Sequence, residues 1–376
     1  MIRYAAGWYH QAHARCVFLR EVSQSAQRSL PITSASPQPQ GVHLVGSVPL
    51  QSAEDVFRTV TGILNGRLRR IPDGETGARS NWIGWQSDVM ARVPQLEMIQ
   101  PDTADYAPMA HFKLRPGADA GAIAFGSLGY AEAARNSYAV FARLRAEGVI
   151  PADRRFQVCL PTPLAPVSAF IVPQDQAAVE PHYEARMLAE LHEIAGAIPR
   201  DDLAIQWDTA IEFALLEGVF PIATADVRAG ILERLARIGA RVPEGVELGY
   251  HLCYGDAGRR HFVQPRDTGK LVDVANALAA QVQRPIKWIH MPVPRDRADE
   301  AYFAPLRDLH LQPGTELYLG LVHFSDGEAG TRRRIEAAQQ AVTEFGVATE
   351  CGFGRRPPET VADLLRIHAA VAAPVA

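Results

Sequence analysis

From residue 41 onward, short apolar and β-branched runs alternate with longer segments whose apolar residues recur at helical spacing. This alternation indicates βαβ units and a parallel sheet. Eight such runs are present, and eight parallel strands close a TIM barrel. The runs are VHLVGS (42–47), LRRIPD (68–73), RFQVCL (155–160), LAIQWD (203–208), VELGYH (246–251), IKWIHM (286–291), ELYLGLVH (316–323) and GVATEC (346–351). We therefore predict an α/β fold, a (β/α)8 TIM barrel.

Two stretches depart from this pattern. The gap between the second and third runs is too long for one connection, and HFKLRPG within it indicates an inserted hairpin or lid over one mouth of the barrel. Residues 1–40 place arginines among Ser, Ala and Gln and continue into PITSASPQPQ, without the apolar core of a secretory signal. We expect a disordered extension or an upstream start there, with a transit-like peptide as the alternative. Residues 41–376 are expected to form one domain.

Composition narrows the class of protein. Hydrophobic residues make up 47% and charged residues 21%, as in globular proteins with a full core. The 38 Lys and Arg residues are interspersed with 42 Asp and Glu residues, so we expect no nucleic-acid partner. No apolar run reaches the about 20 residues that cross a bilayer, so we expect no membrane partner. Four scattered cysteines do not resemble a disulfide framework, which favours a reducing, cytoplasmic location.

Reactive residues recur where the predicted strands end. In a barrel of this type, the loops after the strands converge on one mouth, which holds the active site. Ser and Asp at such ends are ordinary turn residues, but three His and two Cys are not. The barrel would bring all of them to one mouth. The residues at or after the strand ends are Ser47, Asp73, Glu75, Thr162, Asp208, His251, Cys253, His290, His323 and Cys351.

Three of these residues suggest a zinc site. His251 and Cys253 in GYHLCYGD are separated by one residue, so an extended backbone points both side chains to the same side. Cys351, at the end of the eighth run, supplies the third ligand, and catalytic zinc commonly has three protein ligands. Alternatively, a His-x-Cys pair occurs in many strands by chance, and a buried Cys is often a small hydrophobe. Cys159 is assigned to core packing for that reason.

The remaining candidates each allow two interpretations. His290 in WIHMPVP is either a fourth zinc ligand or a hydrogen-bonded core histidine. His323 in LVHFSDG is either a general acid or base, or the cap of a loop. The segment IPDGETG, with Asp73 and Glu75, is either a surface turn or a ligand-binding loop. The two Trp residues of RSNWIGWQ, which follows, would form an aromatic wall of a pocket.

With these residues placed, the chain from about residue 41 to 372 resembles the catalytic domain of cobalamin-independent methionine synthase and its short, archaeal-type relatives, in the superfamily that includes uroporphyrinogen decarboxylase. HLCYGD resembles the family's H-x-C-Y zinc motif, and ECGFGRR its D-C-G-L-x-x-R segment. HLVGSVP, PDGETG with RSNWIGW, LPTPLAP, IQWDTAIEF and LVHFSDG resemble further family motifs in the same order.

The resemblance implies a role for each matching residue. Ser47 would bind the substrate carboxylate and Glu75 its amino group, with Asp73 beside it. Thr162 lies in the loop that resembles the family's T-G-P loop, and Asp208 would bind substrate. His323 would be the acid that protonates the leaving group.

Two departures accompany the resemblance. His290 stands where the family has a glutamate zinc ligand, so a His₂Cys₂ site would be one charge less negative and its bound thiolate less nucleophilic. Thr209 replaces the glutamate of the family's D-E-P-A strand.

The predicted activity is zinc-dependent methyl or alkyl transfer, as in methionine synthase. The partners would be a small thiol acceptor and a methyl or alkyl donor. The alternatives are a zinc-dependent lyase or hydrolase on the same barrel, and a barrel that binds a small molecule without turning it over.

Overall fold

The computed structural model describes residues 38–99, 110–220 and 226–375, so most of the predicted N-terminal extension lies outside the described residues. Seven strands form one parallel sheet in the order β1-β4-β5-β6-β7-β8-β9, and β2 and β3 pair separately in antiparallel fashion. The strands are β1 (Arg70–Pro72), β2 (Leu96–Ile99), β3 (His111–Leu114), β4 (Arg155–Pro161), β5 (Leu203–Thr209), β6 (Glu247–Leu252), β7 (Trp288–Pro292), β8 (Glu316–Val322) and β9 (Gly346–Thr349).

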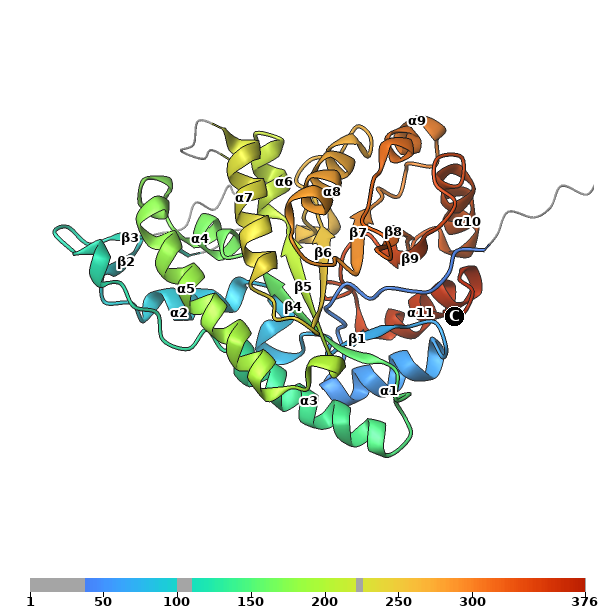
Figure 1. Cartoon of the computed structure of the whole chain (residues 1–376), viewed down its shortest axis with the longest axis horizontal. Helices are drawn as coiled ribbons and strands as arrows, with labels where there is room; N and C mark the ends of the chain where they lie inside the picture. The colour runs from blue at the N-terminus through green and yellow to red at the C-terminus, as the bar shows by residue number, and fades with distance from the viewer. Residues whose placement is uncertain (1–37, 100–109, 221–225, 376) are drawn as a thin grey trace, which may run out of the picture. The chain divides into compact units, whose positions relative to one another are not determined.

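Eleven α-helices occur in the described residues, most of them between successive strands of the main sheet (Figure 1). α1 contacts β1, α3 contacts β4, and α10 contacts β8, so helices cover the side chains on one face of the sheet. The helices are α1 (Ala53–Ile63), α2 (Ser87–Ala91), α3 (Tyr130–Ala146), α4 (Leu164–Phe170), α5 (Pro173–Ala197), α6 (Ile211–Leu216), α7 (Val227–Ala240), α8 (Gly269–Gln281), α9 (Glu300–Phe303), α10 (Gly327–Ala338) and α11 (Val361–Val371).

The predicted first strand, 42–47, forms isolated bridges instead of a continuous ladder. Val42 bridges in parallel to both Leu68 and Val347, which lie beside β1 and in β9, at the two edges of the sheet. The physical reason is that the main chain of this segment hydrogen-bonds to both edges of the sheet in turn. The Val42 N–H donates to the Arg67 carbonyl on one side, and the His43 N–H donates to the Val347 carbonyl on the other. The curled seven-stranded sheet, with this segment between its edges, is consistent with a TIM-like barrel.

The chain between β1 and β4 contains α2 and the β2–β3 pair. HFKL, singled out above as part of a hairpin, forms β3 and pairs with β2 from Leu96↔Leu114 to Ile99↔His111. Phe112 of β3 also bridges to Ile171, just after α4, which ties this segment to the main body. Its interpretation as an insertion over the mouth remains a prediction.

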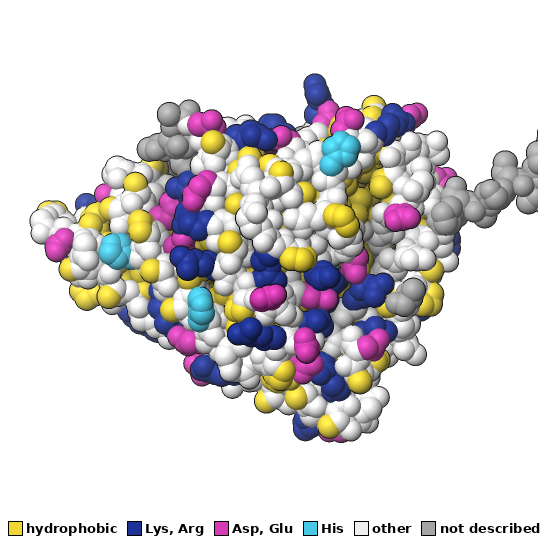
Figure 2. Space-filling model, in the orientation of Figure 1, with side chains coloured by type: hydrophobic (Ala, Val, Ile, Leu, Met, Phe, Trp, Pro, Cys, Tyr) yellow, Lys and Arg dark blue, Asp and Glu magenta, His cyan; other side chains and the backbone are white. Residues whose placement is uncertain are grey.

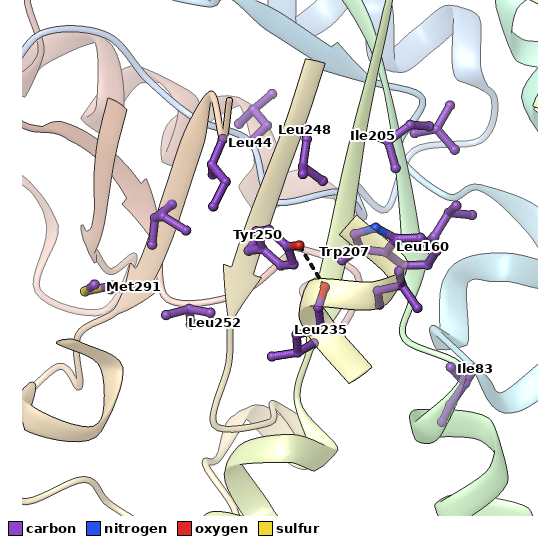
Figure 3. Packing of buried hydrophobic residues seen from close by; sticks show 14 of the residues in the cluster. Leu44, Ile83, Leu160, Ile205, Trp207, Leu235, Leu248, Tyr250, Leu252 and Met291 are labelled. Carbon is purple, nitrogen blue, oxygen red and sulfur yellow. Dashed lines mark hydrogen bonds between the residues drawn. The ribbon is translucent and has the colours of Figure 1, made fainter. Parts of the chain in front are cut away.

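Side chains of the strands alternate between the helices and the interior. Tyr250 of β6 is buried against α7, where its hydroxyl donates to the Leu235 carbonyl at 3.0 Å (Figure 3). Because successive strand residues point to opposite faces, His251 and Cys253 face away from this helix. The packing of Tyr250 therefore orients the two candidate ligands.

The two ends of the main sheet carry different chemistry. At the N-terminal ends of the strands, buried Arg70 donates to Glu247 at 2.5 Å and to Glu316 at 2.8 Å, and its guanidinium lies 4.3 Å from the ring centroid of Trp288. This ion cluster joins β1, β6, β7 and β8. The predicted site residues lie at the opposite, C-terminal ends, as expected for a barrel.

The face of the molecule drawn in Figure 2 shows no large area of one charge. On the face drawn in Figure 2, Lys and Arg side chains are mixed with Asp and Glu side chains. Among the described residues, no helix combines the length and apolar character needed to span a membrane.

Candidate metal and substrate site

A cavity of about 550 Å³ opens at the C-terminal ends of the strands. Its wall combines apolar side chains with a few polar groups, as is usual for small-molecule sites. The polar and cysteine residues that line it include Ser47, Glu75, Ser80, Asn81, His111, Gln176, Asp208, His251, Cys253, Asp256, Cys351 and Arg355. Six predicted site residues are therefore brought to one cavity: Ser47, Glu75, Asp208, His251, Cys253 and Cys351.

The three predicted zinc ligands are together on this wall. The ligand atoms of His251, Cys253 and Cys351 all lie within 4.8 Å of one another. The two sulfur atoms are 3.8 Å apart, and Cys351 Sγ is 3.8 Å from His251 Nε2. Two thiolates bound to tetrahedral zinc at about 2.3 Å would have their sulfurs about 3.8 Å apart. The residues present therefore fit a zinc ion, and the sulfur separation is too long for a disulfide.

The surroundings of His251 and Cys351 shift the pKa values of both groups. Burial lowers the pKa of His251 well below its ordinary value, so its ring is neutral, as metal ligation requires. The contact with Cys253, followed by burial, raises the pKa of the Cys351 thiol well above its ordinary value. A metal cation reverses this effect because it stabilises thiolates directly. The Gly255 N–H also donates to Cys253 Sγ at 3.2 Å, so the main chain fixes the position of this sulfur.

His290 lies directly behind His251. The two residues are register partners on β6 and β7, and their Nδ1 atoms are 2.7 Å apart. The other ring nitrogen of His290, Nε2, is 2.9 Å from the Thr349 carbonyl. Its ring is fully buried, and burial lowers its pKa to about 3. Both nitrogens of His290 thus have protein partners, and His290 is not part of the three-residue group.

Two carboxyl groups face the same cavity, that of buried Asp208 and that of half-buried Glu75. Burial raises the pKa of Glu75 to about 7, with Arg79 opposing and Asp73 reinforcing the shift. Burial, then the charge of Glu75, raises the pKa of Asp208 well above its ordinary value. Asp208 is oriented by Gln206, whose Nε2 donates to Oδ1 at 2.8 Å. The pair therefore retains a proton near neutral pH, which an ammonium group could replace.

The loop that carries Glu75 is held in a strained conformation. Glu75 has φ +50° and Trp82 has φ +46°, values that non-glycine residues rarely adopt. Gly74 has φ +82°, and a larger residue does not fit at this position, because its Cβ would lie 2.6 Å from a methyl group of Val56. Asp73 stabilises the turn by accepting from the Glu75 N–H at 3.0 Å and from Arg79 at 2.6 Å. Such strain occurs mostly at functional sites, which favours the ligand-binding interpretation of this loop.

Ser47 is held against the loop that follows Cys351. Its carbonyl accepts from the Phe353 N–H at 2.7 Å, and its Oγ accepts from the Gly354 N–H at 3.2 Å. A Cβ on Gly352 would lie 2.2 Å from Ser47 Oγ, so any larger residue there would displace the Ser47 hydroxyl. In this contact Ser47 Oγ is the acceptor, so its hydroxyl hydrogen can be donated to a ligand.

Besides His290, three predicted site residues are not among those that line the cavity. Asp73 is occupied with Arg79 and the Glu75 turn, as described. Thr162 donates its hydroxyl to buried Glu212 at 2.5 Å. His323 is buried, with Nε2 donating to the Val293 carbonyl at 2.9 Å and Nδ1 lying 3.7 Å from Glu350. Their proposed contacts with substrate remain predictions.

Sequence reasoning missed four charged or polar residues beside the site. Arg355 and Asp256 line the cavity and form an ion pair at 3.6 Å. Burial raises the pKa of Asp256 to about 6, with Arg355 opposing. Glu350, next to Cys351, pairs with His261 at 3.2 Å. The available signal was sequence proximity, because Asp256 follows the His-x-Cys motif and Glu350 and Arg355 flank Cys351 on either side.

Two further expectations concern packing. Of the two tryptophans expected to form a wall, Trp82 lines the cavity, whereas Trp85 packs edge-on against Tyr130 at 4.8 Å. Cys159 is buried and its Sγ donates to the Val45 carbonyl at 3.1 Å, which confirms its assignment to the core.

The fold is shared with solved structures. No protein-family model matches the sequence, and no curated protein matches it. A protein from Listeria monocytogenes assigned as a vitamin-B12-independent methionine synthase is similar in structure, with a TM-score of 0.51, 14% identity, and coverage of 89% of this chain and 99% of the other.

A B12-independent methionine synthase from Shewanella sp. W3-18-1, in complex with selenomethionine, has a TM-score of 0.55 at 14% identity and covers 89% of this chain and 96% of its own. These similarities establish the fold that the chain shares with both proteins.

Proposed function

We propose that this protein is a zinc-dependent methyl- or alkyltransferase whose acceptor is a small thiol. The observation that carries the proposal is one cavity lined by two unlike groups. His251, Cys253 and Cys351 form a group that could hold a metal ion, and Glu75 and Asp208 present two carboxyl groups to the same cavity. A thiol that also bears an amino group would match both.

The chemistry of the metal accounts for the choice of acceptor. When bound by His251, Cys253 and Cys351, zinc would lower the pKa of a substrate thiol so that the thiol is ionised at neutral pH. The cavity would hold the acceptor thiol close to the donor. The acceptor sulfur would form a bond to the methyl or alkyl carbon, and the bond from that carbon to the donor would break, with its electron pair leaving on the donor.

The carboxyl pair and Ser47 would hold the rest of the acceptor. An ammonium group between Glu75 and Asp208 would replace the proton that their raised pKa values retain. Ser47 would donate its hydroxyl to a substrate carboxylate. The Shewanella protein is in complex with selenomethionine, an amino acid with a methylated selenium, which supports an amino-acid acceptor here.

The departing group of the donor takes up a proton. We propose His323 for this step, linked to the cavity region through Glu350, which lies 3.7 Å from its Nδ1 and next to Cys351 in the chain. Because the Val293 carbonyl holds the Nε2–H, the proton that His323 gives up would first be taken up from solvent on Nδ1, the nitrogen on the side of Glu350. Burial lowers the pKa of His323, and Glu350 opposes this shift. Exchange of His323 for Asn should lower kcat by about a hundredfold or more with little change in thiol affinity.

The experiment that tests the proposal follows the metal's ligands while thiols are added. X-ray absorption at the zinc edge should show one added sulfur neighbour with homocysteine. Mercaptobutyrate, which has the same length but no amino group, should require a much higher concentration, because it cannot pair with Glu75 and Asp208. If the zinc environment stays the same with every thiol while substrate is turned over, the transfer mechanism is wrong. A lyase or hydrolase acting on the same barrel would then account for the site.

A further inference from the structure

His290 is a buried histidine beside the site, and the proposed reaction gives it no role. A fourth zinc ligand would need a ring nitrogen without a protein partner, directed at the ion. The two ring nitrogens of His290 instead lie 2.7 Å from His251 Nδ1 and 2.9 Å from the Thr349 carbonyl. These two contacts determine where the protons are.

The proton positions follow from the acceptor at one end. A carbonyl oxygen only accepts, so His290 Nε2 carries a hydrogen and donates it to Thr349. A neutral His290 then has a bare Nδ1, which must accept. The only donor in the 2.7 Å contact is therefore His251 Nδ1–H. His251 in turn has a bare Nε2, the atom that lies 3.8 Å from Cys351 Sγ.

The opposite arrangement would require a charged ring. If His290 Nδ1 also carried a hydrogen, His290 would be a fully buried imidazolium, and no carboxylate of the described residues hydrogen-bonds to it. Burying such a charge without a partner is costly. In that arrangement a neutral His251 would accept through Nδ1 and carry its hydrogen on Nε2. The Nε2 atom would then not be available to a metal ion.

We infer that His290 is not a zinc ligand but a positioning residue, which fixes the tautomer and ring orientation of His251 so that Nε2 is available to the metal. The inference rests on the proposed zinc site and specifies its ligand number. Metal-bound histidines commonly donate their other N–H to a carboxylate or a carbonyl. Here a second histidine has that role and is itself anchored by the Thr349 main chain at the end of β9.

A zinc site with three protein ligands would be electrically neutral and would have one coordination position open to substrate. One neutral histidine and two thiolates balance the two positive charges of zinc. Only three protein atoms would bind the ion, and catalytic zinc sites commonly have this number. A substrate thiol could then enter without displacing a protein ligand.

Zinc affinity of matched variants tests the inference without any measurement of activity. His290→Phe keeps an apolar ring but removes the acceptor, and should weaken zinc binding by about 10- to 100-fold in competition with a chromophoric chelator. His290→Gln should bind zinc nearly as well as the wild type, because its amide oxygen can accept from His251 and its amide nitrogen can donate to Thr349. His368→Leu, which removes a buried histidine of α11, is the control and should leave zinc affinity unchanged.

Two spectroscopic measurements complete the test. X-ray absorption should find one nitrogen and two sulfur atoms from the protein in the wild type and in both His290 variants. Nitrogen-15 NMR of histidine-labelled wild type needs no variant and should show the proton on Nδ1 of His251 and on Nε2 of His290.

The inference would be contradicted if zinc lost a nitrogen neighbour in His290→Phe, or if His290→Phe bound zinc as tightly as the wild type. It would also be contradicted if His290→Gln bound zinc as weakly as His290→Phe, or if NMR showed the opposite tautomers of His251 and His290. A wild-type protein that binds no zinc would overturn the proposed function itself.

Discussion

Replacing Glu212 by Gln tests whether the Thr162–Glu212 pair serves stability. Glu212 is buried in α6, and its Oε1 accepts the Thr162 hydroxyl at 2.5 Å. Its Oε2 has no hydrogen-bond partner among the described residues. Burial raises the pKa of Glu212 from 4.5 to about 7, with the Thr162 hydrogen bond opposing. Glutamine has the same shape but cannot ionise, so it removes this titration.

The magnitude follows from the shift in pKa. A tenfold change in an acid constant corresponds to about 1.4 kcal/mol, so a pKa raised from 4.5 to about 7 corresponds to about 3 kcal/mol. Between these two pKa values the folded protein binds one proton more at Glu212 than the unfolded protein does. The contribution of Glu212 to the free energy of unfolding of the wild type is therefore fully present below pH 4.5 and is lost as the pH rises through 7. The free energy of unfolding of Glu212→Gln, relative to wild type, should therefore increase by about 2 to 3 kcal/mol between pH 5 and pH 8.

Urea unfolding of both proteins at intervals from pH 5 to pH 8 measures this difference, and other titrating groups cancel because both proteins contain them. Glu190→Gln is the matched control with the opposite sign. Glu190 is also buried, but it accepts the N–H groups of Leu128 and Ala131 at 2.7 and 2.6 Å. Burial opposes these bonds, yet the net pKa of Glu190 is lowered. Its replacement should destabilise the protein at neutral pH, and the loss should shrink as the pH falls.

A difference between Glu212→Gln and wild type that stays constant from pH 5 to pH 8 would refute this reasoning. A decrease with rising pH would refute it more strongly, because it would mean that the folded protein stabilises the Glu212 carboxylate.

Three further predictions concern the site and its support. Glu75→Gln should weaken binding of an amino thiol by about 1.5 to 3 kcal/mol and reduce the protons released on binding, both measurable by calorimetry in buffers of different ionisation enthalpy; unchanged binding would exclude Glu75 as an amine partner. Arg70→Met should destabilise the fold by about 1.5 to 3 kcal/mol in urea, because Glu247 and Glu316 lose their buried cation and keep only the more exposed Arg155 and Arg69, and an unchanged urea midpoint would contradict the role of the ion cluster. Gly352→Ala should cost about 1 to 3 kcal/mol of stability, because its Cβ would meet Ser47 Oγ at 2.2 Å, and an unchanged melting curve would contradict this.

The sequence predicted the location of the ligands because this depends on backbone periodicity. Residues 251 and 253 face the same side of any extended strand, and the C-terminal ends of parallel strands share one edge. The strand that ends near Cys351 was recognised from its apolar run, although β9 ends at Thr349. These features require only the positions of the strands, and so a single sequence was sufficient.

The roles of His290 and His323 could not be predicted in the same way. Both were expected near the mouth because they lie at strand ends, and His290 is beside His251. Whether a ring nitrogen faces a metal or a carbonyl depends on the side-chain rotamer and on main-chain atoms far away in sequence, such as Thr349, 59 residues from His290. No periodicity in the sequence records such contacts. The same holds for Thr162, whose partner Glu212 lies 50 residues away.

The zinc content of the purified protein tests the central claim most directly. Wild type should contain about one zinc per chain, and Cys253→Ser and Cys351→Ser should each lose it, because each removes one of three ligands. Cys159→Ser, which changes a buried cysteine outside the metal-ligand group, should retain the metal. Zinc retained in either ligand variant, or absent from the wild type after purification with zinc supplied, would contradict the account.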